Sequence, residues 1–214
     1  MSEERNPIPK AIPKTAPKGA AEGTTKTTGT SERTEEIEPS HIAGHPVLDF
    51  VNTVAWRTDD SRRAERVPDA AAWTQWAATA GLGATSLPDE AVLHSLREVL
   101  TAVLDAFADG ATPPAPAWTA LREAALGARE DAALPRAFPL RPVPATITGE
   151  LALQAEELLG DARALSRVRR CEGPGCGWFF LDRSRNGARR WCSSGDCGNR
   201  DRARRHYART RQVT

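Results

Sequence analysis

The sequence predicts an α+β chain that is mostly α: a helical N-terminal body with a small β element, followed by a treble-clef-like module at the C-terminal end. Three observations lead to this class. Apolar residues recur at spacings of three and four along the body, prolines interrupt that pattern between residues 134 and 148, and all four cysteines lie within residues 171–197. The 214 residues suit one full-sized domain with small appendages.

The first 40 residues are expected to form a disordered tail. They combine scattered prolines with a Thr and Lys run and only isolated Ile residues, so they cannot bury enough apolar surface to offset the entropy of ordering. They also lack the apolar core of a secretory signal, and no stretch of the chain approaches the ~18 apolar residues of a membrane span. We therefore expect a cytoplasmic protein that does not contact membranes.

A short helix is predicted from Pro46, which can occupy a first helical turn. Its apolar face consists of Val47, Val51, Val54 and Ala55. Asn52 is a poor choice inside a helix, because its amide competes for backbone groups, so it is either solvated or held by a partner. Polar residues in this apolar segment suggest a small-molecule pocket lined by Asp49, Asn52 and Arg57.

Further helices are predicted at residues 68–80, at 87–109, over 118–126 and at 149–170. Their expected buried stripes are Trp73, Trp76, Ala77 and Ala80; Val92, Leu96, Val99, Val103 and Phe107; Trp118, Leu121, Ala125 and Leu126; and Leu151, Ala155, Leu158, Ala162 and Leu165. Between residues 134 and 148 four prolines forbid a helix, and the intervening apolar residues favour short edge strands, so a small sheet element is expected there.

The four cysteines form the pattern C-x4-C-x15-C-x4-C, made by Cys171, Cys176, Cys192 and Cys197. Two close pairs separated by the length of a hairpin can surround one tetrahedral Zn²⁺, and four thiolates leave no open position for catalysis. The alternatives are two disulfides, which a reducing cytoplasm disfavours, and iron, whose comparable sites use tighter C-x2-C pairs. The pattern therefore predicts a structural zinc ion.

Between the two pairs, residues 178–181 and 188–191 are expected to be the two strands of a hairpin, with turn residues at 182–187. Residues 198–211 contain no proline and predict a helix in which Arg202, Arg205 and Arg209 share one face and Ala203 and Tyr207 share another. Two knuckles, a hairpin and a helix are the arrangement of treble-clef zinc modules.

Charge is distributed unevenly along the chain. The formal net charge is +1, yet residues 161–214 contain 14 arginines against five acidic residues, while residues 1–160 contain 15 basic and 23 acidic residues. Such segregation indicates that the basic part meets a polyanion, the alternative being that it docks on the acidic body.

The C-terminal segment closely resembles the CGNR zinc finger. The matching runs are Cys176-Gly177-Trp178-Phe179-Phe180-Leu181-Asp182, Ser184-Arg185-Asn186, Arg189-Arg190-Trp191-Cys192 and Cys197-Gly198-Asn199-Arg200. Upstream, Leu48-Asp49-Phe50-Val51-Asn52-Thr53 resembles the ABATE domain. The resemblance implies a tail at 1–40, an ABATE-like regulatory domain at 41–165, a finger at 166–214, and a bacterial stress-induced transcription regulator that binds DNA and responds to a small-molecule effector.

The residues then predicted to bind nucleic acid are Arg185, Arg189, Arg190, Asn199, Arg200, Arg202, Arg205 and Arg209. For Asn199 and Arg200 the alternative is a structural role, as helix-capping residues or as a screen for the negative zinc centre. The alternative function is an RNA-binding or protein-interaction module, in which Trp178, Phe179 or Trp191 would be exposed for stacking. No phosphate-binding Gly-rich loop, nucleophile elbow or clustered histidines indicate an enzyme.

Overall fold

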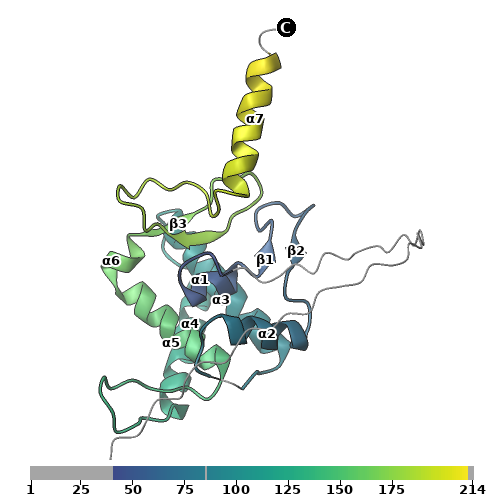
Figure 1. The fold of residues 1–214 in the computed structure, drawn as a ribbon. Helices are drawn as coiled ribbons and strands as arrows, with labels where there is room; N and C mark the ends of the chain where they lie inside the picture. The colour runs from purple at the N-terminus through teal and green to yellow at the C-terminus, as the bar shows by residue number, and fades with distance from the viewer. Residues whose placement is uncertain (1–40, 85, 212–214) are drawn as a thin grey trace, which may run out of the picture. The chain divides into compact units, whose positions relative to one another are not determined.

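The computed structural model describes residues 41–84 and 86–211 (Figure 1). The tail expected at residues 1–40 lies outside the described residues. The helices are α1 (Pro46–Val51), α2 (Ala70–Thr79), α3 (Glu90–Ala108), α4 (Ala115–Asp131), α5 (Ile147–Gly160), α6 (Ala162–Leu165) and α7 (Cys197–Arg211). The strands are β1 (Val54–Ala55), β2 (Ala64–Glu65), β3 (Val168–Arg170) and β4 (Phe179–Leu181). The predicted class, α+β and mostly α, is confirmed.

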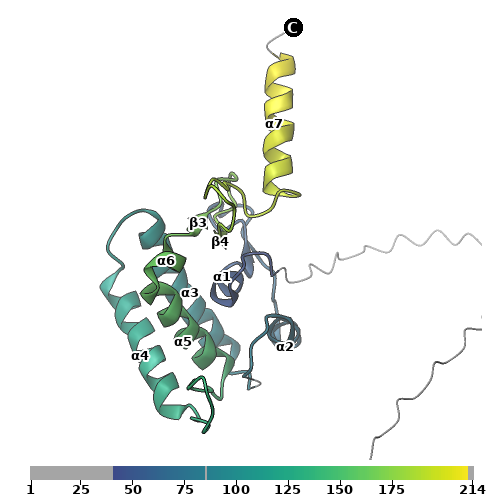
Figure 2. The same cartoon turned by 60° about the vertical axis from the view of Figure 1, so that its left-hand side comes forward.

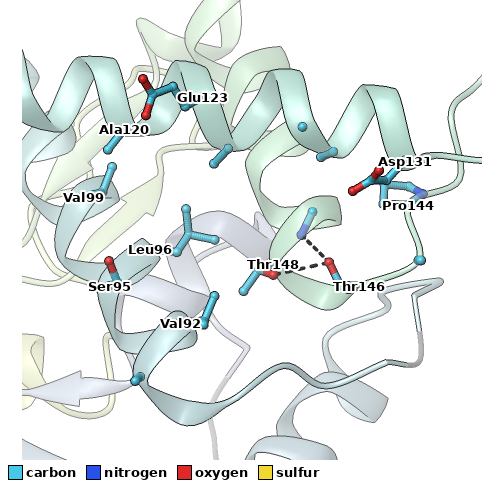
Figure 3. A pocket seen from close by; sticks show the side chains of 16 residues that line it. Val92, Ser95, Leu96, Val99, Ala120, Glu123, Asp131, Pro144, Thr146 and Thr148 are labelled. Atoms are coloured by element: carbon cyan, nitrogen blue, oxygen red, sulfur yellow. Dashed lines mark hydrogen bonds between the residues drawn. The ribbon is translucent and has the colours of Figure 1, made fainter.

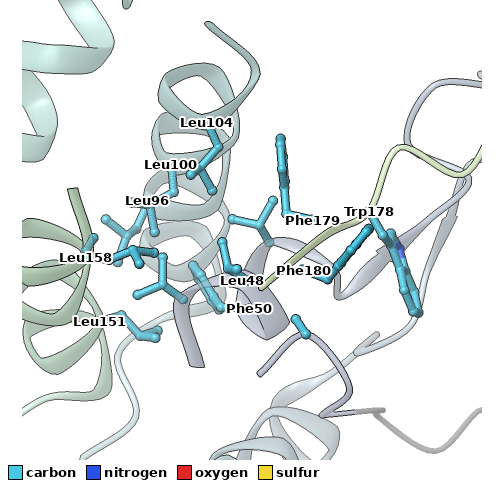
Figure 4. Close-up of a cluster of buried hydrophobic side chains, with 14 of the residues drawn as sticks. Leu48, Phe50, Leu96, Leu100, Leu104, Leu151, Leu158, Trp178, Phe179 and Phe180 are labelled. Carbon is cyan, nitrogen blue, oxygen red and sulfur yellow. The ribbon is translucent and has the colours of Figure 1, made fainter. Parts of the chain in front are cut away.

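Helices α3, α4 and α5 pack beside one another, and α1 packs against α3, α5 and β4 (Figure 2). Strand β1 pairs with β2, and β3 with β4, both antiparallel. The buried apolar side chains form one cluster that runs from Leu48 of α1 and Leu100 of α3 to Phe179 and Phe180 of β4 (Figure 4). The core therefore crosses the boundary predicted between residues 165 and 166.

Helix α1 begins at Pro46 as predicted, with the ring of His45 accepting a hydrogen bond from the N–H of Val47 at 3.2 Å. It ends earlier than predicted. Val54 and Ala55 belong to β1, and Asn52 is the C-terminal cap rather than an interior helix residue. The side chain of Asn52 is bound to another segment, as described below.

The predicted stripes of α3 and α4 were partly wrong. Leu96 and Val103 of α3 are buried as predicted, but Val92 is 49% exposed and Val99 and Phe107 are only partly buried. The buried stripe of α3 consists of Leu93, Leu96, Leu100, Val103 and Leu104. In α4, Leu121 and Ala125 are buried but Trp118 and Leu126 are half exposed. The predicted face and the observed face of each helix both have apolar residues at helical spacing. Which face is buried depends on packing against the neighbouring helices.

No sheet element forms in residues 134–148. The segment makes isolated bridges, between Ala133 and Val143 and between Thr146 and Ser86, and Phe138 is 99% exposed. Four prolines remove the N–H donors that a continuous ladder would need. Helix α5 begins at Ile147, where the hydroxyl of Thr146 accepts the N–H of Gly149 at 3.1 Å.

The expectation of a helix through residue 170 and of a hairpin made by 178–181 and 188–191 was also wrong. Residues 168–170 are strand β3, and they pair with β4 in the register Val168 to Leu181 and Arg170 to Phe179. The backbone of 188–191 makes other bonds: the N–H of Arg189 is donated to the carboxylate of Asp182 at 2.9 Å. Among the described residues, no helix combines the length and apolar character required to cross a membrane.

Candidate metal centre and basic helix

The four cysteines come together at one buried point. Their Sγ atoms all lie within 4.8 Å of one another, and those of Cys176 and Cys197 each lie 3.7 Å from that of Cys192. A tetrahedron with metal–sulfur bonds of ~2.3 Å has sulfur–sulfur edges of about 3.8 Å. The four side chains therefore have the spacing and the donor type to hold one metal ion.

Local backbone structure presents these sulfurs. Cys171 follows β3 and donates its N–H to Trp178 O at 2.7 Å, Cys176 closes a turn on Gly173 O at 2.9 Å, and Cys197 is the first residue of α7. The sulfur of Cys171 accepts the N–H groups of Gly173 and Cys192, at 3.4 and 3.3 Å. Together with side-chain donation from Cys176 and Cys192, the largest contribution, these bonds lower the pKa of Cys171 and favour its thiolate.

Arg200 belongs to the metal centre more closely than the sequence indicated. Its guanidinium donates to the sulfur of Cys197 at 2.9 Å. Partial burial opposes its charge, but the bond to this sulfur raises the pKa of Arg200. A guanidinium here offsets part of the negative charge of four thiolates, which is the structural role considered for this residue.

The first cysteine knuckle, the turn that carries Cys171 and Cys176, packs on the N-terminal body. The N–H groups of Arg57 and Thr58 are donated to Cys176 O and Gly175 O, at 3.1 and 3.2 Å. Gly175 and Gly177 have φ values of +73° and +64°. A Cβ at Gly175 would lie 2.8 Å from the side chain of Asp59, and a Cβ at Gly177 would lie 2.7 Å from the side chain of Thr58. Glycine is required at both positions because the backbone is left-handed and the body lies in direct contact.

The predicted effector residues Asp49, Asn52 and Arg57 are all buried and have partners inside the chain. Asn52 donates to Phe179 O at 2.8 Å and accepts the N–H of Phe179 at 2.9 Å. Arg57 donates to Gly177 O at 2.5 Å and to the carboxylate of Asp105 at 2.9 Å. Burial lowers the pKa of Arg57, against the opposing effect of Asp105.

Asp49 accepts the N–H of Ala43 at 2.9 Å, and burial raises its pKa to about 6. A cavity of 530 Å³ lies between α3, α4 and residues 144–149, and its wall includes Ser95, Val99 and Glu123 (Figure 3). None of Asp49, Asn52 and Arg57 lines it. Effector binding by these three residues stays a prediction, and their observed contacts join the body to the finger and to its own backbone.

Asp182 organises the loop between β4 and the second cysteine pair, a role the sequence did not reveal. It is fully buried, and its carboxylate accepts the N–H and hydroxyl of Ser184, at 2.9 and 2.6 Å, and the N–H of Arg189. Burial alone would raise its pKa, but these donors lower it. The available signal was Asp-x-Ser directly after a strand, a pattern typical of side chains that bond the backbone two residues on.

The predicted nucleic-acid residues outside α7 differ in their surroundings. Arg185 is exposed in the loop 183–187. Arg189 is half buried, stacks on Phe180 with its Cζ 4.4 Å from the ring centroid, and donates to Trp191 O at 2.8 Å. Arg190 is exposed and ion-paired with Glu172. Asn199 is exposed in the first turn of α7.

Helix α7 carries six arginines and one acidic residue. Only Cys197 and Gly198 in it are buried, and residues 202–211 are all exposed. The predicted apolar face is exposed: Ala203 is exposed, and Tyr207, whose ring contacts that of His206, is 69% exposed. The described part of the chain contains no partner for Arg209, while Arg205 is paired with Asp201.

The aromatic residues of the finger are in its core. Trp178 and Phe179 are buried, Trp191 is half buried, and the indole N–H of Trp178 donates to Val54 O at 2.7 Å. A flat stacking surface of these residues, the feature on which the RNA-binding alternative depended, is therefore absent from the described residues.

The fold and site together define a helical protein with a C-terminal finger built on four cysteines, in which the second cysteine pair leads into a basic helix. Two family models match the chain in this order. Residues 44–170 match ABATE, described as "Putative stress-induced transcription regulator", and residues 167–210 match the CGNR zinc finger. The chain belongs to the ABATE family and carries a CGNR zinc finger. No curated protein matches it.

Proposed function

We propose that this protein is a DNA-binding transcription regulator whose finger holds one Zn²⁺ and presents α7 to DNA. The observation that carries the proposal is the basic helix itself. It starts at a metal ligand, which fixes its first turn, and the side chains of residues 202–211 are all exposed. Arginines that are not used for packing are free to bind phosphates.

Zinc is the proposed metal because the four donors are thiols at the spacing of a closed tetrahedral shell. Such a shell leaves no position for water or substrate, so the ion supplies folding free energy rather than chemistry. Four free thiols suit a reducing compartment, so the proposed regulator is cytoplasmic. Because the metal site has no open position, the proposal does not include an enzymatic activity.

The chemistry of α7 suits a nucleic-acid backbone. Arg202, Arg205 and Arg209 share one face, and Arg202 donates to Ser194 O at 3.0 Å, which joins the helix to the second knuckle. Guanidinium groups along one helix face can bind phosphates on both sides of a groove and the edges of guanine within it. The ABATE part is the proposed regulatory half, and the cavity of 530 Å³ in Figure 3 has a volume suited to a small-molecule effector.

The test is the salt dependence of DNA binding by the full chain. Changing Arg202, Arg205 and Arg209 together to Ala is expected to flatten the slope of log affinity against log salt by about 2.7, that is by about 0.9 for each phosphate contact. Zinc content should stay at one per chain, because none of the three is a ligand. The matched control changes Arg122, Arg136 and Arg141, three exposed arginines of the body, to Ala.

The control variant loses the same charge and is expected to keep the wild-type slope. Equal slopes for wild type and the α7 variant would remove α7 from the interface. A wild-type protein that contains zinc but shows no salt-dependent DNA binding would overturn the proposal in favour of a protein-interaction module.

A further inference from the structure

We infer that the loop between β1 and β2, in the ABATE part, forms a second half of the DNA interface, and that Arg62 in this loop binds a backbone phosphate. The inference rests on the proposed function, because it extends the same interface to a segment outside the finger. It is carried by a stack of side chains around Trp56.

Trp56 joins the loop to the first turn of α7. The Cζ of Arg62 lies 3.2 Å from the centroid of its ring, and the Cζ of Arg200 lies 4.5 Å from it. Trp56 itself has a φ of +54°, a left-handed conformation that is rare for a bulky residue and is held only when the surroundings enforce it. Two arginines from the two family segments are thus brought to one aromatic ring.

The finger fixes the place of this loop. Trp56 lies against Gly175, where a Cβ would be 3.3 Å from the Cε3 atom of the indole. The next residues, Arg57 and Thr58, donate their N–H groups to the first knuckle. The loop therefore keeps its position relative to the metal centre and to the first turn of α7.

The stack places two positive charges at one ring, and only one of them has an anionic partner inside the described residues. Arg62 is exposed and makes no ion pair within the described residues, and Arg200 makes its polar contact with the sulfur of Cys197. The acidic residues of the loop are Asp59, which accepts the hydroxyl of Ser61 at 2.7 Å, and Asp60, which is exposed. Arg200 already faces the thiolate of Cys197, whereas Arg62 has no anion bound to it within the described part of the chain, so a phosphate beside the ring can pair with Arg62.

The position of Arg62 relative to α7 indicates which anion it binds. A helix that lies in a DNA groove has the sugar–phosphate backbone on its flanks, and groups beside its first turn meet phosphates. Arg62 lies beside that turn because it shares the Trp56 ring with Arg200. The predicted ligand of the Trp56 stack is therefore a phosphate of the same DNA that α7 binds.

The experiment compares the salt slope of DNA binding for the full-length wild type, Arg62→Ala, Arg62→Lys and Arg63→Ala. Arg63 is the adjacent control, exposed like Arg62 but ion-paired with Glu98 of α3 at 3.3 Å. We expect Arg62→Ala to lower the slope by about 0.9, and Arg62→Lys, which keeps the charge, to restore it. Arg63→Ala should match wild type.

A wild-type slope for Arg62→Ala, in a protein whose slope the α7 variant does flatten, would overturn this inference and leave the proposed function standing. Equal losses in Arg62→Ala and Arg63→Ala would also overturn it, because the effect would then come from net charge and not from the Trp56 stack. Absence of salt-dependent binding by wild type would overturn both proposals.

Discussion

At the scale of single residues, Asn52 shows how a polar side chain can join two segments. It makes both hydrogen bonds of a backbone peptide with Phe179, a residue 127 positions away. Both partners are buried, so neither the N–H nor the C=O of Phe179 can turn to water. A side-chain amide offers a donor and an acceptor side by side, which matches the two groups of a backbone peptide.

Replacing Asn52 by Ala is expected to lower the free energy of unfolding by about 2 to 4 kcal/mol, because two buried backbone groups lose their partners. Urea denaturation measures the change. The control is Asn186→Ala, at an exposed position in the loop 183–187, where a change within ±0.5 kcal/mol is expected. A similarly small change for Asn52→Ala would contradict the role assigned to it.

Asp49 makes stability depend on pH. Burial raises its pKa from 3.8 to about 6, so the folded state holds the proton more tightly than the unfolded state. The contribution of Asp49 to the unfolding free energy therefore falls as pH rises through this window, by about 1 kcal/mol between pH 5 and pH 7. Asp49→Asn removes the titrating group and should remove this contribution from the profile.

Urea unfolding of wild type and Asp49→Asn at pH 5, 6 and 7 tests this expectation. Other groups, including His41 and His45, whose pKa values burial lowers, titrate in both proteins, so the difference between the two profiles isolates Asp49. Parallel profiles would show that the carboxyl of Asp49 ionises in the folded state as easily as in the unfolded state.

At the scale of elements, the two cysteine pairs make different demands on their glycines. Gly177 has a φ of +64° and faces Thr58 of the body, whereas a Cβ at Gly195 would meet only Ser193 Oγ at 3.7 Å, an ordinary contact. The first knuckle is an interface with the body, and the second knuckle is exposed at this point.

Gly177→Ala is therefore expected to destabilise the fold by more than 1 kcal/mol, through left-handed strain and the clash with Thr58. Gly195→Ala should be neutral within about 0.5 kcal/mol. Thermal unfolding of the zinc-loaded variants, with their metal content, compares the two. Equal effects would mean that any change near a ligand is harmful and that docking on the body is not the cause.

Local sequence patterns predict the helices of this chain but not the faces that they bury or the strand partners. Helices α2, α3, α5 and α7 follow from local apolar spacing and from the absence of proline, and their existence was predicted. The face that α3 buries and the partner of β4 were not, because they depend on contacts between distant segments. Residues 179–181 form the strand predicted there, but its partner is β3, while the 188–191 segment is held by a hydrogen bond from the N–H of Arg189 to the Asp182 carboxylate.

The same distinction holds for the site. Four cysteines in close pairs predict a common metal centre, because spacing alone brings each pair together. The contact of Arg200 with Trp56 and the contacts of Arg57 with the first knuckle could not be predicted, since they join residues more than 100 positions apart in the sequence. A polar residue in an apolar segment, such as Asn52, indicated that a partner exists without identifying it.

At the scale of the whole molecule, the finger and the helical body share one core. Phe179 and Phe180 of β4 lie in the same cluster as Leu48 of α1 and Leu100 and Leu104 of α3 (Figure 4). Independent folding of the two family segments would need each to close its own core. The metal centre is therefore expected to stabilise the body as well as the finger, although the cysteine motif read by itself suggests a separable module.

Replacing Cys176 by Ser, or removing the metal with a chelator, should accordingly destabilise α3 and α5 together with the finger. Loss of one ligand loosens the first knuckle, which withdraws Phe179 and Phe180 from the core and orphans Asn52 and Arg57. Hydrogen exchange read by mass spectrometry resolves the two parts, and faster exchange is expected in peptides from α3 and α5. Ser193→Ala, beside a ligand but not one itself, is the control and should exchange like wild type, and zinc returned to the chelated protein should restore protection. Undiminished protection of α3 and α5 in Cys176→Ser would show that the body holds its fold without the finger and that the shared core contributes little to its stability.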